Sequence, residues 1–573
     1  MWQQIYDPLN SSFLSSLFAA LPVVVMLGGL GFFHMKAHFA AIAGLVVALV
    51  IAIVIFGMPW AMALKTAFTG GLFGLLPIGW IILNIIFLYK LTSEAGLFKI
   101  LQESIAGIST DRRVQLLLVA FSFGAFFEGA AGFGTPVAVT GAVLIGLGFS
   151  PLAASGLSLI ANTAPVAFGA LGTPILTLAK VTGLDAFELS AMVGRQLPFF
   201  SLIVPFWLIW AFVGFKGMMQ IWPAILVAGV FFAVPQFLVS NYMGPELVDV
   251  IAAIASMAAL AAFLKIWQPG NVWTSVTRDG QTVSAAEAEK NRIHHGYSSA
   301  EVMRAWTPWV ILSVVVFLWG TTTVKNLLNG EYPNPEKGKP PITTSYSAIT
   351  KIDFPIPGLS EQIQRMPPVA PKDAKPEKIS FTLNWLSTTG TGILLASLIA
   401  GIVMGIPFGK MLRTYGQTIY AIRYSLLTIV AMLALGFVTR YSGVDVTLGL
   451  AFAATGPFYP FFGTLLGWLG VALTGSDTAS NVLFGGLQKT TSEQLGLSPI
   501  LMCAANSSGG VMGKMIDAQS IVVASTATNW FGHEGEILRY VFFHSVALAC
   551  LVGLFVTLQA YVPPFTDMVI WPR

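Results

Sequence analysis

Two carboxylates are candidates for chemistry because each lies beside a glycine-rich interruption of a long apolar stretch. Glu128 begins EGAAGFGTPVAVT, and Asp477 lies within TGSDTASNVLFGG. A carboxylate at membrane depth is costly and is taken as functional by default. Burial favours the neutral acid, so each group could take up a proton and couple it to an anion. The alternative is structural: each carboxylate could cap the free N–H groups of a helix start, and Ser-Asp-Thr favours this role more strongly at Asp477.

Three cationic or titratable side chains are further candidates. Lys514, in GGVMGK, could pair with an anionic ligand or neutralise Asp477 or Asp517, or its long stem could carry the amine to the membrane interface. His544, within an apolar run, could relay protons, although a helix–helix contact is the favoured interpretation. Arg195, in VGRQLPF, is expected to be an interfacial anchor rather than a ligand.

The interruptions occur in two segments that resemble each other, 114–180 and 446–527. Each has a cluster of small and polar residues, then LGFSPL or LGLSPI, then a second such cluster that begins with Asn162 or Asn506. We expect each copy to form a re-entrant hairpin followed by a discontinuous span. The hairpin tips are predicted at Gly132, Gly134 and Pro136 and at 475–481, and the breaks at 162–163 and 506–508. Helix N-termini at such breaks suit a carboxylate.

The composition indicates the elements that must position these residues. Of 573 residues, 55% are hydrophobic and 10% are charged, against about 25% charged in soluble domains. Apolar runs long enough to cross a bilayer predict an all-α, polytopic membrane protein with about 12–14 spans. The sequence has no stripe of basic residues of the kind that indicates nucleic-acid binding. Cys503 and Cys550 form no disulfide or metal pattern, no cofactor is expected, and MWQQIYDPLN lacks the positive region of a cleaved signal peptide.

The apolar runs and the two repeats divide the chain into nine segments. They are N-terminal spans 1–113, first hairpin and broken helix 114–180, connecting spans 181–265, a cytoplasmic loop 266–304 with His294, His295 and AAEAEK, a span 305–324, an external Pro/Lys-rich loop 325–384 with PPITTS, spans 385–445, second hairpin and broken helix 446–527, and a C-terminal span 528–573.

Lys and Arg residues of the short loops predict the orientation. One alternating set of loops is rich in them, including Arg112 and Arg113, whereas the opposite set holds little more than Lys65 and Arg440. The rich set is assigned to the cytoplasm, which places the N-terminus outside and gives the two repeats opposite topology. Inverted repeats with interrupted helices are the architecture of many secondary transporters, with the site near the midplane.

Several stretches resemble the signature sequences of the lactate permease family. These are EGAAGFGTPVA, NTAPVAFGALGTPI, VGRQLPF, LTGSDTASN and GKMIDAQS, and WQQIYDP and RAWTP are similar to the same family. The resemblance covers nearly the whole chain and is weakest across 325–384. It implies a symporter of the bacterial cytoplasmic (inner) membrane that moves lactate, and often glycolate, with protons. It also implies distant kinship with the ion-transporter superfamily, whose members use paired hairpins and elevator-type motion.

A 2-hydroxy acid has a carboxylate and a hydroxyl, and the polar residues of these clusters can form hydrogen bonds with both. The same residues could instead form hydrogen bonds with backbone groups that are left unpaired at the helix breaks. The expected substrate-binding residues are Gly132, Gly134, Thr135, Asn162, Thr163, Thr173, Ser476, Thr478, Asn481, Asn506, Ser507 and Lys514. The expected proton-coupling residues are Glu128, Asp477 and His544.

Alternative functions are weighed against this prediction. A sodium-coupled transporter of other carboxylates is the main rival, because Ser-, Thr- and Asn-rich breaks also suit Na⁺. An enzyme is not expected, because the sequence has no nucleophile with a placed base and no zinc spacing. A channel is disfavoured because inverted broken repeats need no pore. The partners expected are lactate or glycolate, protons and the lipid bilayer, with a homodimer left as an alternative.

Overall fold

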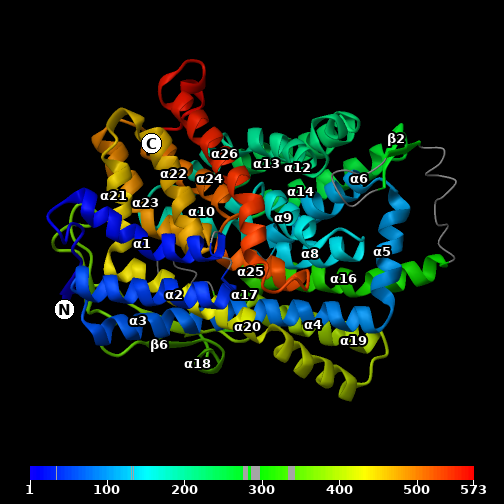
Figure 1. The fold of residues 1–573 in the computed structure, drawn as a ribbon, viewed down its shortest axis with the longest axis horizontal. Helices are drawn as coiled ribbons and strands as arrows, with labels where there is room; N and C mark the ends of the chain where they lie inside the picture. Colours follow the sequence, from blue (N-terminus) through cyan, green and yellow to red (C-terminus); the bar gives the residue numbers. More distant parts are fainter. Residues whose placement is uncertain are drawn as a thin grey trace. The chain divides into compact units, whose positions relative to one another are not determined.

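The fold was analysed in a computed structural model, which describes residues 1–31, 33, 35–130, 132, 134–274, 282–284, 297–332 and 342–572. Helices dominate the described residues, and the strands form only short two-stranded ladders (Figure 1). The predicted all-α class is therefore confirmed. His294, His295, AAEAEK and the first two residues of PPITTS lie outside the described residues.

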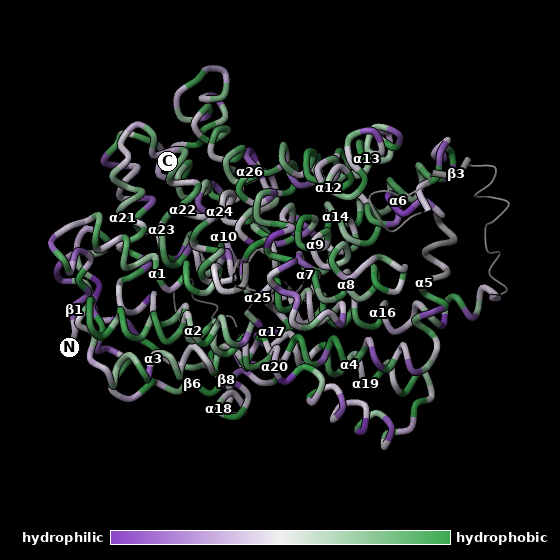
Figure 2. The backbone as a smooth tube through the Cα atoms, viewed as in Figure 1, coloured by the Kyte–Doolittle hydropathy of each residue, from purple (hydrophilic) through white to green (hydrophobic). Residues whose placement is uncertain are grey.

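Ten helices in the described part of the chain are long and apolar enough to cross a membrane, or eleven if the bent pair 151–161 and 166–182 is one span. Four shorter apolar helices lie at 135–146, 248–263, 389–403 and 444–453. Hydrophobic residues run along most of the helices (Figure 2), and large apolar side chains such as Phe13, Val54 and Phe543 point outward. This is a multi-pass membrane protein, and the number 12–14 stays a prediction.

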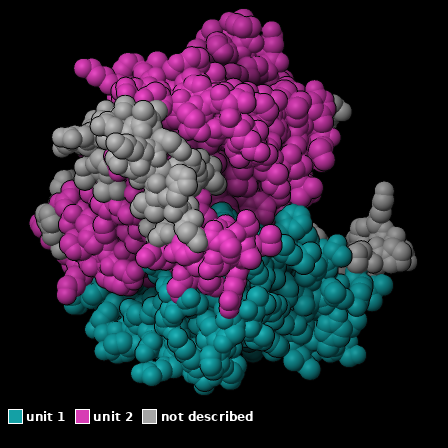
Figure 3. Space-filling view, turned by 90° about the vertical axis from the view of Figure 1, so that its right-hand side faces the viewer, with its two compact units in different colours: residues 1–26, 38–95, 306–448 teal, residues 27–37, 96–305, 449–573 magenta. Residues whose placement is uncertain are grey.

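The chain forms two compact units (Figure 3). Unit 1 comprises residues 1–26, 38–95 and 306–448, and unit 2 comprises 27–37, 96–305 and 449–573. Each unit draws on sequence segments that lie far apart in the chain, so the nine segments predicted from the sequence do not map one to one onto the units.

Unit 1 is built mainly from long apolar helices. Its helices are α1 (Ser12–Gly31, in part), α2 (Ala37–Val50) with η1 (Ile51–Ile55), α3 (Trp60–Phe73), η2 (Gly74–Gly79), α4 (Trp80–Glu94), α16 (Ser299–Gly320, mostly), α17 (Thr322–Asn329), α18 (Ser347–Thr350), α19 (Thr389–Val403), α20 (Phe408–Ser442) and the start of α21 (Val444–Ala453). Glycine allows α3 to approach α20, because a Cβ at Gly70 would lie 2.5 Å from the carbonyl oxygen of Leu433.

Short strands occur in the segment predicted as an external loop. β1 (Trp2–Gln3) pairs in parallel with β7 (Ile363–Gln364), β4 (Glu331–Tyr332) with β5 (Ile342–Thr343), and β6 (Ile352–Pro355) with β8 (Ser380–Leu383), both antiparallel. The described part of this segment thus forms turns, short helices and ladders within unit 1.

Unit 2 holds the first repeat and, from residue 449 onward, the second. The first comprises α6 (Arg112–Leu116), η3 (Leu117–Phe123), α7 (Gly124–Ala130), α8 (Thr135–Gly146), α9 (Pro151–Ala161), η4 (Val166–Phe168) and α10 (Gly169–Thr182). The second comprises η5 (Gly456–Phe458), α22 (Tyr459–Thr474), α23 (Asp477–Gln494), α24 (Pro499–Gly513) and α25 (Ala518–Ala527). The remaining elements are α5 (Leu97–Ile108), α11 (Ala186–Val193), α12 (Leu197–Met219), α13 (Trp222–Tyr242), α14 (Val248–Phe263), β2 (Asn271–Trp273), β3 (Thr282–Ser284), α26 (Glu534–Tyr561) and η6 (Phe565–Met568).

The Ser-Pro turns begin α9 in the first repeat and α24 in the second in the same way. Ser150 accepts a hydrogen bond from the backbone N–H of Ala153, and Ser498 accepts one from Leu501. Each serine is an N-cap, and the proline after it occupies the first helical position, where its missing N–H costs nothing. The shared caps support the repeat inferred from the sequence.

The second break lies later than predicted. Asn162 ends α9 as its C-cap, but Asn506–Ser508 lies inside α24, which continues to Gly513. Asn506 and Ser507 direct their side chains to Asn481 and Asp477 rather than to nearby backbone, so they do not compete with the helix ladder. The interruption instead spans 514–517, where Asp517 caps α25 by accepting from the N–H of Ser520 at 2.7 Å.

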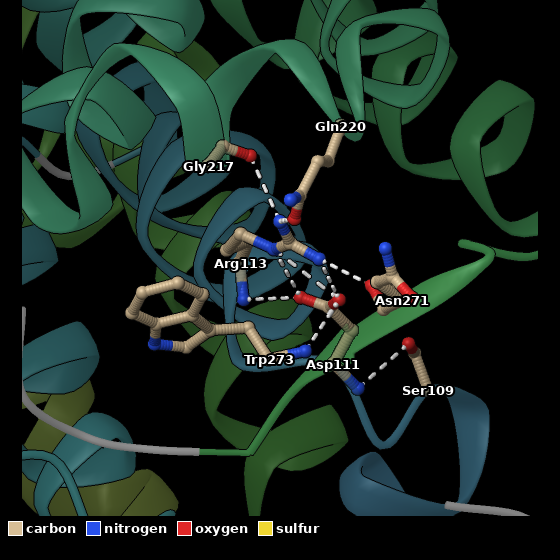
Figure 4. A network of polar contacts seen from close by, with 7 residues as sticks. All are labelled: Ser109, Asp111, Arg113, Gly217, Gln220, Asn271 and Trp273. Carbon is tan, nitrogen blue, oxygen red and sulfur yellow. Dashed lines mark hydrogen bonds and ion pairs between the residues drawn. The ribbon is translucent and has the colours of Figure 1, made fainter. Parts of the chain in front are cut away.

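Arg113 is not an exposed loop residue, although the predicted membrane orientation counted it among the charges of a cytoplasmic loop. It is fully buried, and its guanidinium pairs with Asp111 at 2.5 Å. It also donates to the carbonyl oxygens of Gly217 and Asn271 at 2.8 and 2.7 Å, while the backbone N–H of Trp273 donates to Asp111 (Figure 4). The pair therefore joins the start of α6, the end of α12 and β2.

Candidate functional site

A partly open cavity, with about 340 Å³ of empty space that includes its mouth, lies within unit 2. It is lined by Glu128, Gly132, Val166, Gly169, Ala170, Pro174, Gly475, Ser476, Asp477, Thr478 and Lys514. These residues come from the tip between α7 and α8, the break before α10, the tip between α22 and α23, and the break after α24. The interruptions of the two repeats thus meet at one cavity.

Glu128 lies near the C-terminal end of α7 and is only 4% exposed. Its Oε2 accepts a hydrogen bond from Asn162 Nδ2 at 3.1 Å. Glycine at the start of α10 makes room for its other oxygen, since a Cβ at Gly169 would lie 2.5 Å from Oε1. The first hairpin tip and the first break therefore cooperate to hold this carboxylate at the cavity wall.

The start of α10 has an unusual backbone. Ala170, Leu171 and Gly172 have φ angles of +46°, +55° and +72°, and such angles are strained for the two residues that carry a Cβ. The Thr173 hydroxyl donates to the carbonyl oxygen of Ala170 at 2.6 Å and supports this turn. The turn brings the backbone of Gly169 and Ala170 to the cavity, so Thr173 acts on the backbone and does not line the cavity.

Asp477 is the first residue of α23, and the helix is capped by its neighbour. Ser476 is the N-cap and accepts from the N–H of Ala479, so Asp477 is not needed for capping. Asp477 Oδ2 accepts hydrogen bonds from the Ser507 hydroxyl and from Asn481 Nδ2. Its Oδ1 is buried with no hydrogen-bond partner among the described residues. One oxygen is therefore held and the other is available.

A chain of buried amides leads to Asp477. Tyr459 donates its hydroxyl to Gln488 Oε1 at 2.7 Å, and Gln488 Nε2 donates to Asn506 Oδ1 at 3.0 Å. Asn506 Nδ2 then donates to Asn481 Oδ1 at 2.9 Å. Each donor orients the next amide, so Asn481 presents its NH₂ group to Asp477. Tyr459 and Gln488 were missed from the sequence, although Gln488 lies seven residues after Asn481 and hence on the same face of α23.

Lys514 is 3% exposed and lies at the cavity. Its Nζ donates to the carbonyl oxygen of Gly475 at 2.6 Å and lies 3.5 Å from Asp517 Oδ2. Of the alternatives considered from the sequence, neutralisation of Asp517 is the one observed, and extension of the stem to the membrane interface is not. The lysine links the second break to the second hairpin tip.

Several predicted residues lie elsewhere. Gly134, with φ +83°, precedes α8 and faces Val523. The hydroxyl of Thr135 is buried and has no hydrogen-bond partner in the part of the chain that the structure describes, and the Thr163 hydroxyl donates to the carbonyl oxygen of Ile160. None of the three lines the cavity.

His544 and Arg195 also lie away from the cavity lining. His544 Nδ1 accepts from Trp207 Nε1 at 3.0 Å within a cluster of aromatic rings. Arg195 contacts Asn241 Oδ1 and the carbonyl oxygen of Met568. Neither is brought to the candidate site. Among the described residues, no group of three or more His, Cys, Asp or Glu is arranged to hold a metal ion.

Sequence reasoning also missed Asp249, in α14. It is 1% exposed, and neither carboxylate oxygen has a hydrogen-bond partner among the described residues. The sequence did contain a signal, because Asp249 is a lone aspartate at the start of the apolar run 247–264. That run was interpreted only as a membrane span.

Comparison with known proteins extends these observations. The model of the L-lactate permease family matches residues 15–563. The glycolate permease GlcA of Escherichia coli K12 is 46% identical, covering 99% of each chain. The L-lactate permeases of E. coli K12 and Bacillus subtilis 168 are each 44% identical, covering 98% of this chain and 98% and 99% of theirs.

A solved structure of MtrF from Neisseria gonorrhoeae, described as illuminating a class of antimetabolite efflux pumps, covers 94% of this chain and 97% of its own. The TM-score is 0.36 at 12% identity, a likeness too low to inform fold or function.

The family match spans nearly the whole chain and includes the hairpin tips and breaks around the cavity. This chain belongs to the L-lactate permease family of membrane transporters, which are not enzymes.

Proposed function

We propose that the protein is a proton-coupled symporter of L-lactate and related small 2-hydroxy monocarboxylates, including D-lactate and glycolate. The names of its relatives support this substrate class. The cavity is lined by small and polar residues from both repeats, which suits a small polar substrate.

The observation that carries the proposal is the charge pattern of the cavity. Glu128 and Asp477 line it from the two hairpin tips, and Lys514 is the one cation among its described lining residues. Lys514 lies 3.5 Å from Asp517, which offsets much of its charge. An incoming anion therefore meets two carboxyl groups, and like charges close together in a buried site repel strongly. Proton uptake removes that repulsion, so binding of protons and of the anion is linked.

The same cavity offers groups to hold the substrate. Lys514 and the N–H groups at the start of α23 suit the substrate carboxylate. The hydroxyls of Ser476 and Thr478 suit the 2-hydroxyl group. Asn162, Asn481 and Ser507 act through the two carboxyl groups, because their hydrogen bonds hold Glu128 or Asp477. Asn506 acts one step further away, by donating to Asn481.

Transport would follow if only the fully loaded or the empty protein crosses between states easily. We propose a bacterial cytoplasmic membrane as its location, an external N-terminus, and elevator-type motion of one repeat-based part against the rest. The resemblance between the two broken repeats supports the last of these. Opposite topology of the repeats is testable by labelling single cysteines placed in the loops before α6 and before α22.

Uptake of labelled L-lactate into vesicles holding purified protein tests the proposal. An inward proton gradient is expected to drive accumulation, and a sodium gradient at equal pH is not. Glu128→Gln and Asp477→Asn should each abolish gradient-driven accumulation while the protein stays inserted. Glu493→Gln is a matched control, because this carboxylate on α23 is not part of the cavity lining.

Sodium-driven accumulation would instead favour the rival transporter of other carboxylates. Full proton-driven accumulation by both amide variants would remove the carboxylate-coupling mechanism. Counterflow with lactate, glycolate and unsubstituted carboxylates would then rank the substrates.

A further inference from the structure

The two repeats contribute unlike walls to the cavity of unit 2. The tip and break of the second repeat supply hydroxyl, carboxyl and ammonium groups, from Ser476, Asp477, Thr478 and Lys514. Among the described lining residues, the break of the first repeat supplies, besides a glycine, three residues with apolar side chains, Val166, Ala170 and Pro174. We call these three residues the apolar wall.

The backbone carbonyl groups of the apolar wall are already bonded within the protein. The carbonyl oxygen of Val166 accepts from the backbone N–H three residues later. The carbonyl oxygen of Ala170 accepts from the Thr173 hydroxyl at 2.6 Å, and that of Pro174 accepts from Asn481 Nδ2 at 3.3 Å. The wall therefore presents mainly hydrocarbon to the cavity, because its side chains are apolar and its carbonyl oxygens are engaged.

Ala170 and Lys514 occupy equivalent positions in the two repeats. Each lies eight residues after the asparagine that begins the second cluster of its repeat, and each directly follows a glycine. Both residues line the cavity. One repeat thus places an ammonium group where the other places a methyl group, so a ligand that fits both has an anionic end and a small apolar end.

The methyl group of Ala170 lies where the cavity has little spare room. A Cβ at Gly132, which also lines the cavity, would lie 3.1 Å from Ala170 Cβ. Ala170 and Val166 are only 7% and 3% exposed. Because packed interiors respond to a change of a single methyl group, these two side chains can limit the size of what lies against them.

We infer that the apolar wall is the subsite for the substituent on C2 of the substrate, and that Ala170 and Val166 set the size of that substituent. The substrate carboxylate and hydroxyl then face the second repeat. A hydrogen atom or a methyl group at C2, as in glycolate or lactate, fits the wall, whereas a charged substituent there would lose its hydration without a partner. This inference rests on the proposed transport of small 2-hydroxy monocarboxylates.

Competition in counterflow tests the subsite. Vesicles that hold purified protein are preloaded with L-lactate, and entry of labelled L-lactate is measured against increasing glycolate, 2-hydroxybutyrate or tartronate. Tartronate has a carboxylate in place of the methyl group of lactate. The wild type should need at least about 100-fold more tartronate than unlabelled lactate for half-inhibition, because the wall offers no partner to a second charge.

Ala170→Gly should widen the subsite without harm to the fold. Ala170 has a φ of +46°, which glycine adopts without the steric cost of a Cβ. The concentration of 2-hydroxybutyrate that halves exchange should fall about tenfold relative to that of glycolate, since one methylene group in an apolar pocket contributes about that factor or more. Val166→Ala should change this ratio in the same direction. Ala167→Gly is the matched control, because Ala167 is fully buried and is not part of the cavity lining, and it should keep the wild-type ratio.

An unchanged ratio in both Ala170→Gly and Val166→Ala would overturn the inference, and so would an equal change in Ala167→Gly. Half-inhibition of the wild type by tartronate and by lactate at equal concentrations would also overturn it, and this arm needs no variant. Counterflow needs no proton gradient, so exchange without proton-driven accumulation would defeat the proposed coupling while the competition series still judges the wall. Absence of lactate exchange by the wild type would defeat the proposed function and the inference that rests on it.

Discussion

Asn162 donates a hydrogen bond from Nδ2 to Oε2 of Glu128 at 3.1 Å. The asparagine ends α9 and the glutamate lies near the end of α7, so this one contact ties the first broken helix to the first hairpin tip. The Asn162 Oδ1 atom is buried and has no hydrogen-bond partner among the described residues. The amide is thus held from one side by the carboxylate.

Replacement of Asn162 by Ala should reduce lactate uptake about tenfold, because a hydrogen bond to a charged group contributes about 1.5–3 kcal/mol. Initial rates of uptake at saturating and limiting lactate measure the loss. Thr163→Val is the control, since the Thr163 hydroxyl bonds only to the backbone of Ile160 among the contacts described. Equal losses in the two variants would argue against a specific role for Asn162.

Gly169→Ala should impair the site more than it impairs the fold. The added Cβ would lie 2.5 Å from Glu128 Oε1, so the carboxylate must move, and such overpacking costs about 1–3 kcal/mol. We expect at least a tenfold loss of apparent lactate affinity. Gly416→Ala is the control, because a Cβ added at Gly416 in α20 would have no neighbouring atom within 4 Å. This variant should retain wild-type affinity. Unchanged affinity in Gly169→Ala would show that Glu128 tolerates displacement.

Lys514→Gln should weaken lactate binding by at least tenfold, because the substrate carboxylate would lose its cation. The Asp517 charge would also be left uncompensated, which adds to the loss. Binding assays on purified protein, with lactate displacing a labelled analogue, measure the affinity. Lys489→Gln controls for charge, as Lys489 bonds to the carbonyl oxygen of Thr182 and is not part of the cavity lining. Equal affinities of both variants and the wild type would contradict the proposal.

Arg113→Leu should destabilise the protein strongly. Removal of one partner from a buried ion pair costs about 3–5 kcal/mol, and Asp111 would be left buried without its cation. The double variant with Asp111→Leu should recover much of that stability. Thermal unfolding in detergent measures both, and Arg112→Leu, whose guanidinium bonds only to Gln115 among the contacts described, should have little effect. A double variant less stable than either single variant would refute this pairing.

Gln488 illustrates what the sequence could and could not reveal about the site. The glycine-rich interruptions and their carboxylates are local features, so Glu128, Asp477 and both hairpin tips could be predicted from the sequence. The amide chain through Gln488 and Tyr459 depends on how α22, α23 and α24 pack. No periodicity of one helix specifies which side chain of another helix will face it.

Asp249 and Arg113 show the same limit for charges. A lone aspartate in an apolar run does not indicate its neighbour, and an arginine at a loop is ordinarily solvated. Their surroundings come from the contact of α14 with α7 at Gly129 and from the approach of β2 to α6. These contacts join residues far apart in the chain.

The sequence by itself determined that the chain is helical and spans a membrane, because hydropathy and segment length depend only on neighbouring residues. It also indicated the hairpin tips and the first break, because Gly, Pro and capping residues act locally, but it placed the second break too early, at 506–508 instead of 514–517. Only the tertiary structure decided that the interruptions of unit 2 surround one cavity, and which hydroxyl or amide holds each carboxylate. Those outcomes depend on side-chain packing between distant segments, whose energies are summed over the whole unit.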